Sequence, residues 1–198
     1  GGAGACAAIE AHDKGSKVLI IEKMAQPGGN TAISSGGFMV PQDGPTALKY
    51  LTATYDLANS EKDDELLNTF CKEIMGVKDW MTGLKEGTEL WVYGHAGFQN
   101  LPGWEVIDKY RVRGKKRSGD CLFDLYRYAV EEKRNIPVML ETPAVQLIQK
   151  DGQVVGAVAQ NNGKNINIKA NKAVILTTGG YEFDPESLRT YAQGENYH

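Results

Sequence analysis

The first 22 residues constrain the fold of this chain most strongly. It begins Gly1-Gly2-Ala3-Gly4 and continues through small, helix-favouring residues to Lys14, and Gly15 then marks a helix stop. The apolar run from Lys17 to Glu22 (KVLIIE) is typical of a strand buried in a parallel sheet. This order predicts a helix that packs beside a parallel strand, as in a βαβ unit.

The opening residues match the last four positions of the dinucleotide-binding motif G-x-G-x-x-G. In that motif the glycines let the backbone approach a pyrophosphate, which lies at the helix N-terminus. We expect the motif's first glycine and its preceding strand upstream of residue 1. A glycine cluster alone indicates a flexible tail. Here the following strand ends in Glu22, where a carboxylate can accept hydrogen bonds from an adenosine ribose. We therefore expect a dinucleotide site rather than an ordinary capped βα unit.

The segment after Glu22 separates FAD from NAD. Residues 27–37 contain two diglycines and several hydroxyl or amide side chains, and they are too polar and flexible for a strand. Glycine backbone and donors such as Asn30 and Thr31 suit a flat ring or a phosphate. A nicotinamide-binding unit would continue into another helix here, and an ordinary surface loop would carry more charge. The composition favours FAD and leaves an NAD(P)-dependent dehydrogenase as a rival.

At this point the sequence resembles the fumarate reductase/succinate dehydrogenase flavoprotein family, whose pattern E-K…GGNT-x-x-(small)(small)-GG is matched by residues 22–37. Residues 141–157 resemble the family's adenine-contacting strand and the turn and strand after it, and residues 176–180 resemble its strand that returns to the ADP moiety. The resemblance covers 1–45 and about 120–185. It implies an FAD site made of Gly2, Ala3, Gly4, Glu22, Lys23, Gly29, Asn30, Thr31, Ser35, Gly36, Gly37, Ala144, Thr178 and Gly179.

The resemblance also implies a chemistry, namely hydride transfer between flavin N5 and an activated C–C bond of a small molecule such as an enoate or a ring ketone. Respiratory members carry covalent FAD on a histidine where this chain has Asn30, so we expect non-covalent FAD. A His-Arg-Pro segment of the soluble fumarate reductases is absent from residues 111–120, which makes fumarate a doubtful substrate. The family's capping domain, with its catalytic arginine, is expected beyond the chain, so no catalytic residue is assigned. The alternative is an FAD-binding module without activity of its own.

The fold class expected is α/β: a Rossmann-like FAD-binding domain with a parallel sheet, a helical insertion and an inserted antiparallel β-meander, truncated at both ends. We divide it into a βαβ part with the flavin loop (1–45), a helical and loop insertion (46–118) and a final part with helix, meander and returning strand (119–198). Because the central strand is expected upstream, we expect this chain alone to fold in part and to bind FAD poorly.

Local patterns predict the remaining elements. Apolar spacing of 3.6 residues predicts helices over 48–58, 66–77 and 121–133, with Asp63 or Asp64 as a cap, and a loop over 83–119. Strands are expected over 137–140, 144–149, 154–160 and 165–169, with hairpin turns at Asp151-Gly152 and Asn162-Gly163, and a buried strand over 173–177. The aromatic residues of the loop either face substrate or pack over the helices, and we favour packing.

Composition excludes several other classes of protein. With 198 residues and a net charge of −3, the chain gives no case for nucleic acid or an anionic membrane surface, and the run from Lys115 to Arg117 is expected to be a solvated loop. No apolar stretch approaches the roughly 20 residues of a membrane span. Three separated cysteines and three scattered histidines indicate neither a disulfide framework nor a metal site. The partners expected are a small-molecule substrate and an electron-donor protein or domain. The cysteines slightly favour the cytoplasm over an exported form.

Overall fold

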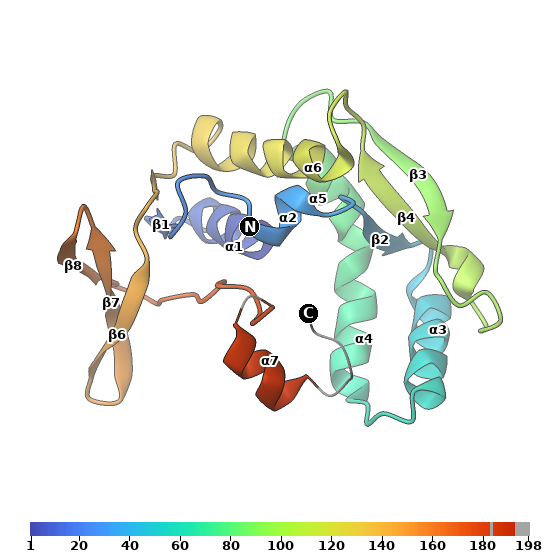
Figure 1. The fold of residues 1–198 in the computed structure, drawn as a ribbon. Helices are drawn as coiled ribbons and strands as arrows, with labels where there is room; N and C mark the ends of the chain where they lie inside the picture. Colours follow the sequence, from blue (N-terminus) through green and yellow to red (C-terminus); the bar gives the residue numbers. More distant parts are fainter. Residues whose placement is uncertain (183, 193–198) are drawn as a thin grey trace.

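The computed structural model describes residues 1–182 and 184–192, which form an α/β arrangement (Figure 1). Helix α1 (Gly2–Asp13) is followed by β1 (Ile20–Ile21), which pairs in parallel with β5 (Val138–Met139). The α/β fold class is thus confirmed, although β1 is shorter than the expected strand over 17–22. Backbone hydrogen bonds extend the β1–β5 pairing at both ends, from Ile20 N to Pro137 O (3.0 Å) and from Glu22 N to Met139 O (2.9 Å).

Helix α1 packs on the helix expected over 121–133, which the structure divides into α6 (Ser118–Arg127) and a π-helical turn, η3 (Tyr128–Glu132). The small side chains of α1 allow this approach, and its Ile9 is fully buried in the main core. At the far end of α1, Arg134 donates to both carboxylate oxygens of Asp13 at 2.7 and 2.6 Å. Core packing and this ion pair fix the direction of α1, and therefore the position of its N-terminus.

The middle of the chain supplies the remaining long helices. These are α3 (Gly44–Leu57), α4 (Asp64–Glu73), a 3₁₀ turn η1 (Ile74–Gly76) and α5 (Val77–Gly83). Asp43 caps α3 by accepting from Thr46 N at 2.7 Å, and Asp63 caps α4 by accepting from Leu66 N at 2.9 Å. The helical part of the insertion is confirmed, and Asp63 rather than Asp64 is the cap.

The prediction of a loop over 83–119 is wrong. This segment contains β3 (Leu90–His95), a 3₁₀ turn η2 (Trp104–Val106) and β4 (Ile107–Val112). Both strands join β2 (Phe38–Pro41), which starts directly after the flavin loop, in an antiparallel sheet of order β2-β4-β3. A register shift between Val92 and Gly94 interrupts the alternation in β3, which explains why no strand pattern was recognised there.

The expected β-meander is confirmed as β6 (Ala144–Lys150), β7 (Gln153–Asn161) and β8 (Lys164–Lys169), all antiparallel. Its two turns are Asp151-Gly152 and Asn162-Gly163, and all four residues have positive φ, as type I′ hairpin turns require. The meander projects from one side of the molecule, next to β1 (Figure 1).

The expected buried strand over 173–177 is not formed. None of the described strands pairs with it, and Ile175 and Leu176 are more than 60% exposed. An apolar run becomes a strand only where another strand lies beside it to accept its hydrogen bonds. Helix α7 (Pro185–Tyr191) follows.

Candidate functional site: a nucleotide cradle between two helix N-termini

The N-termini of α1 and of the short helix α2 (Gly29–Ile33) meet at one point. The main-chain N–H of Gly2 donates to Thr31 Oγ1 at 2.8 Å, and a Cβ on Gly1 would lie 3.0 Å from Gly28 O. In the described part of the chain, no side chain caps either helix. Apart from Gly2 N–H, which is bonded to Thr31, first-turn N–H groups of both helices are therefore available to an anion at this point.

The rest of the first glycine motif is closely packed. A Cβ on Gly4 would lie 2.9 Å from Thr177 Oγ1, so the segment before Thr178 and Gly179 approaches the start of α1. Below α1, Tyr126 lies under Gly2, and burial raises the pKa of its phenol. The returning segment is thus at the predicted place although it is not a strand.

The flavin loop, residues 28–37, packs on the N-terminus of α6. A Cβ on Gly36 would overlap the carbonyl group of Ser118 and lie 2.7 Å from Gly119 N. A Cβ on Gly119 would in turn overlap the carbonyl oxygen of Ser34 and lie 2.6 Å from Ala32 O. Gly36 also has a positive φ of 65°. Only residues without a side chain allow these two backbones to approach so closely.

A second group of predicted residues lies at the other end of the cradle. Glu22 follows β1, and its Oε1 accepts from Met24 N at 2.9 Å. The main chain of Glu22 is tied to the start of the meander because Thr142 N donates to Glu22 O at 2.8 Å. Thr142 is fully buried, and its Oγ1 accepts from Asn161 Nδ2 at 2.7 Å. Ala144 lies two residues further on, at the start of the edge strand β6.

The remaining predicted residues lie in and around the flavin loop and after β1. Asn30 Nδ2 donates to Glu182 Oε1 at 3.3 Å, which links the flavin loop to the segment after Gly180. Lys23, Ser35 and Gly37 are exposed. A Cβ on Gly37 would overlap the hydroxyl of Tyr93, which reaches across from β3.

Sequence reasoning assigned no role to Gly119 or Thr142, and it counted Tyr93 only among the aromatic residues of the loop. Thr142 and Gly119 are the positions that hold Glu22 and the flavin loop in place. A glycine directly after the expected start of a helix was the one available signal for Gly119. Thr142 lies in the segment that resembles the family's adenine-contacting strand, but its contacts with Glu22 and Asn161 depend on chain segments that only the fold brings together.

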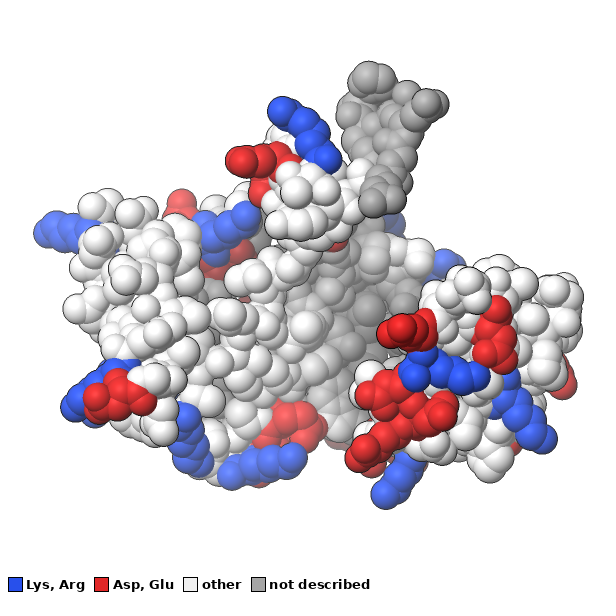
Figure 2. Space-filling view, turned by 90° about the horizontal axis from the view of Figure 1, so that it is seen from below, with Lys and Arg blue, Asp and Glu red and all other residues white. Residues whose placement is uncertain are grey.

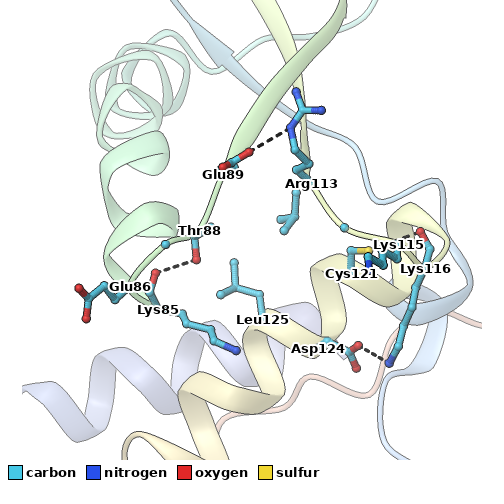
Figure 3. A pocket seen from close by; sticks show the side chains of 13 residues that line it. Lys85, Glu86, Thr88, Glu89, Arg113, Lys115, Lys116, Cys121, Asp124 and Leu125 are labelled. Atoms are coloured by element: carbon cyan, nitrogen blue, oxygen red, sulfur yellow. Dashed lines mark hydrogen bonds and ion pairs between the residues drawn. The ribbon is translucent and has the colours of Figure 1, made fainter.

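A cavity of about 430 Å³ lies on the opposite side of α6, between the turn at 85–89 and the end of β4 (Figure 3). It contains none of the residues predicted from the sequence. Its rim is closed by two ion pairs, Lys116 with Asp124 (2.6 Å) and Arg113 with Glu89 (3.2 Å).

The ion pairs around that cavity explain the basic run at 115–117. Lys116 is paired with Asp124 of α6, and Arg117 donates to Asp120 at 3.0 and 3.1 Å, which lowers the pKa of that carboxyl. Two of the three cations are thus neutralised by the following helix. This agrees with a solvated loop rather than a polyanion site.

The described residues contain no cluster of three potential metal ligands and no helix long and apolar enough to span a membrane. One of the three histidines, His198, lies outside the described residues. The face seen from below in Figure 2 has a hollowed, largely uncharged middle, with charged side chains gathered toward its rim.

These observations fit a dinucleotide with a flat ring. The two adjacent helix N-termini suit a pyrophosphate. The Glu22 carboxylate, which accepts only from Met24 N two residues away, suits a ribose. Among the described residues, β6 pairs with a strand on one side only, so its other edge can hydrogen-bond an adenine. The glycines at 36 and 37 let the loop pack closely on Ser118 and Tyr93, which fixes its position beside the junction of the two helices. Fold and site together define a Rossmann-like nucleotide-binding domain.

The chain belongs to the FAD binding domain family, which matches residues 1–198. FAD is therefore the cofactor of this domain. It is 31% identical to a fumarate reductase (cytochrome) of Shewanella frigidimarina over 95% of this chain and 33% of that protein. It is also 31% identical to a urocanate reductase of Eggerthella lenta, over 96% and 32% of the two chains. The resemblance to fumarate reductase flavoproteins is confirmed, and the chain spans about a third of the length of these relatives.

Comparison with solved structures shows the same fold. The open conformation of a flavocytochrome c3 fumarate reductase superposes with a TM-score of 0.81 at 26% identity, over 97% of this chain and 34% of that one. A 3-ketosteroid delta1-dehydrogenase from Sterolibacterium denitrificans gives 0.83 at 19% identity, over 94% and 47%, and shares the fold. A helix at 29–33 is what an NAD-binding unit was expected to show, but α2 has only five residues, and the family match decides for FAD.

Proposed function

We propose that this chain is the FAD-binding part of an oxidoreductase that adds or removes hydrogen at an activated C–C bond of a small molecule. The observation that carries the proposal is the junction of α1 and α2, where Gly2 N donates to Thr31 Oγ1 and the first turns of both helices lie together. Several relatives are named for reductions of this kind, among them urocanate reductase and acrylate reductase. When bound, FAD supplies hydride chemistry at N5, and the protein supplies position and electrostatics.

In this proposal each group of predicted residues binds a different part of FAD. Main-chain N–H groups of Ala3 and Gly4 hold the pyrophosphate, and Gly2, whose own N–H is bonded to Thr31, lets the backbone approach it. Thr178 and Gly179 close this region from the other side. Glu22, assisted by Lys23, binds the adenosine ribose. The remaining assignments are Ala144 for the adenine and Gly29, Asn30, Ser35, Gly36 and Gly37 for the flavin half.

Binding is non-covalent in this proposal, because Asn30 occupies the place of a linking histidine and its amide donates to Glu182 instead. The division into 1–45, 46–118 and 119–198 remains a proposal, as do the electron-donor partner and a cytoplasmic location. The second candidate, a binding module without chemistry, differs only in what happens after FAD is bound.

An absorbance spectrum of the purified holoprotein tests these points in order. We expect a flavin spectrum that is bleached by dithionite and recovers when an enoate such as acrylate or urocanate is added without oxygen. A stable flavin spectrum that no such acceptor restores supports the binding module, and a full-length protein containing this chain that is purified without flavin refutes the proposal. Acid precipitation is expected to release the yellow cofactor into the supernatant, whereas covalent FAD would stay in the pellet.

A further inference from the structure

An arginine that has no counter-ion in the described part of the chain lies beside the end of the flavin loop. In the pairing of β2 with β4 the last matched residues are Phe38 and Tyr110, so Gly37 and Arg111 are the next residues along the two segments. Opposite residues of antiparallel strands have Cα atoms about 5 Å apart. The position of Arg111 on β4 is thus adjacent to the last glycine of the flavin loop.

A tyrosine of β3 holds the guanidinium at this place. Arg111 Cζ lies 3.9 Å from the centre of the Tyr93 ring, which is a cation–π contact. The hydroxyl of the same tyrosine packs on Gly37, because a Cβ built there would overlap it. Tyr93 therefore contacts both the guanidinium and the flavin loop, and one side chain separates the two.

Arg111 lies on the face of the β2-β4-β3 sheet that points away from the main core. The next residue, Val112, is buried in that core, and Phe38 and Leu90 of the other two strands pack against it. Because side chains alternate along a strand, Arg111 and its opposite residue Trp91 point to the other face. Arg111 is half-buried there, with its guanidinium on the aromatic ring.

The described residues leave the charge of Arg111 uncompensated. Its Nε is buried without a hydrogen-bond partner, and none of the ion pairs among these residues includes it. Arg113, two residues further along β4, differs because it pairs with Glu89 at 3.2 Å. An aromatic ring attracts a cation but does not neutralise it. A partly buried cation of this kind favours a negative charge nearby.

We propose that Arg111 stabilises the negative charge of the reduced flavin and so raises the midpoint potential of the bound cofactor. This rests on the proposed function, in which Ser35, Gly36 and Gly37 bind the flavin half. Reduction of the neutral ring takes up two electrons from the donor and one proton from solvent, which leaves one negative charge on the ring. A nearby guanidinium lowers the free energy of that anion and has little effect on the neutral ring.

The size of the effect follows from the strength of such interactions. Two unit charges about 10 Å apart near a protein surface shift an equilibrium by about tenfold. For a two-electron couple, a tenfold change in the equilibrium constant corresponds to about 30 mV. By linkage, the same cation strengthens binding of the reduced cofactor by the same factor and leaves the affinity for oxidised FAD unchanged.

Arg111→Gln in the full-length holoprotein tests the proposal, with Arg113→Gln as the matched control on the same strand. We expect Arg111→Gln to lower the midpoint potential by about 30 mV, measured against a reference dye, because the reduced form loses about tenfold in stability. Arg113→Gln should keep the wild-type potential, because Glu89 already neutralises that arginine. Arg111→Lys keeps the charge and should restore most of the potential.

Sulfite gives a readout that needs neither a substrate nor an electron donor. The lone pair of its sulfur forms an S–N5 bond and no group leaves, so the ring of the adduct gains negative charge. We expect the Kd for sulfite, followed by bleaching of the flavin absorbance, to rise about tenfold in Arg111→Gln and to stay unchanged in Arg113→Gln. Arg111→Met, which keeps an apolar stem over Tyr93, repeats both measurements if Arg111→Gln lowers the melting temperature.

Three results overturn the proposal. The first is an unchanged potential with an unchanged sulfite Kd in the Arg111 variants. The second is loss of oxidised FAD from these variants, which makes Arg111 a residue of the binding site or the fold. The third is a higher KM for acrylate with an unchanged potential, which makes it a substrate ligand. Wild-type holoprotein that reduces no enoate contradicts the proposed function alone, because potential and sulfite Kd can still be measured on it.

Discussion

Replacing Gly36 with Ala tests whether the flavin loop depends on close backbone contact. The residue has φ +65°, where an alanine costs about 1–2 kcal/mol. Its Cβ would also overlap the Ser118 carbonyl group and lie 2.7 Å from Gly119 N, and such overpacking adds about 1–3 kcal/mol. Gly15→Ala is the matched control, because Gly15 has φ +78° and no atom within 4 Å of its ideal Cβ.

The difference between Gly36→Ala and Gly15→Ala isolates the contact. We expect Gly36→Ala to have a free energy of unfolding lower than the control by about 1–3 kcal/mol in urea titrations followed by circular dichroism. This corresponds to a melting temperature lower by about 2–12 °C for a protein of this size. In the full-length protein, FAD titration followed by flavin fluorescence should show weaker binding for Gly36→Ala and not for Gly15→Ala. Equal unfolding free energies for the two variants would refute the close packing of the loop on α6.

Three further variants test other parts of the structure. In the full-length protein, Glu22→Ala should weaken FAD binding about 10- to 100-fold without unfolding the protein, because a charge-assisted hydrogen bond is worth about 1.5–3 kcal/mol; an unchanged Kd by fluorescence contradicts the ribose assignment. Arg134 lowers the pKa of Asp13, so their ion pair stabilises the fold fully above about pH 4 and is lost as pH falls further. Asp13→Asn should therefore flatten the acid side of a stability–pH curve, and an unaltered slope counts against the pair. Thr142→Val leaves Asn161 without its acceptor and should cost about 1–3 kcal/mol in urea unfolding; a neutral result would show that water replaces the hydroxyl.

The elements with local patterns were predictable from the sequence. Three elements are examples: helix α1, the helix capped by Asp63, and the meander with its Asn162-Gly163 turn. Each follows from apolar spacing, a capping residue or turn residues that lie close together in the sequence. The same local signals place the glycine clusters at the starts of α1 and α2, where the structure has them.

The remainder depends on partners distant in the sequence. In β4 the buried Asp108 breaks the apolar alternation. Two of its partners, Gln42 and His95, lie far from it in the sequence, so no local pattern identifies either the strand or its pairing with His95. At 173–177 the prediction of a strand is wrong. The apolar composition of these residues indicates a strand, but none of the described strands pairs with them. A sequence pattern therefore predicts which segments can form strands, and the neighbouring strands in the fold determine which of them do.

The contact between Gly36 and Ser118 also bears on the order in which the protein is made. The flavin loop leaves the ribosome well before the residues that shape it, because its packing surface is encoded roughly 80 residues later. Until α6 has been synthesised, residues 28–37 lack the backbone of Ser118 and Gly119 against which they pack. Cofactor capture is therefore a late event in the biogenesis of this domain, and nascent chains that stop before Ser118 should emerge without flavin however long they are given.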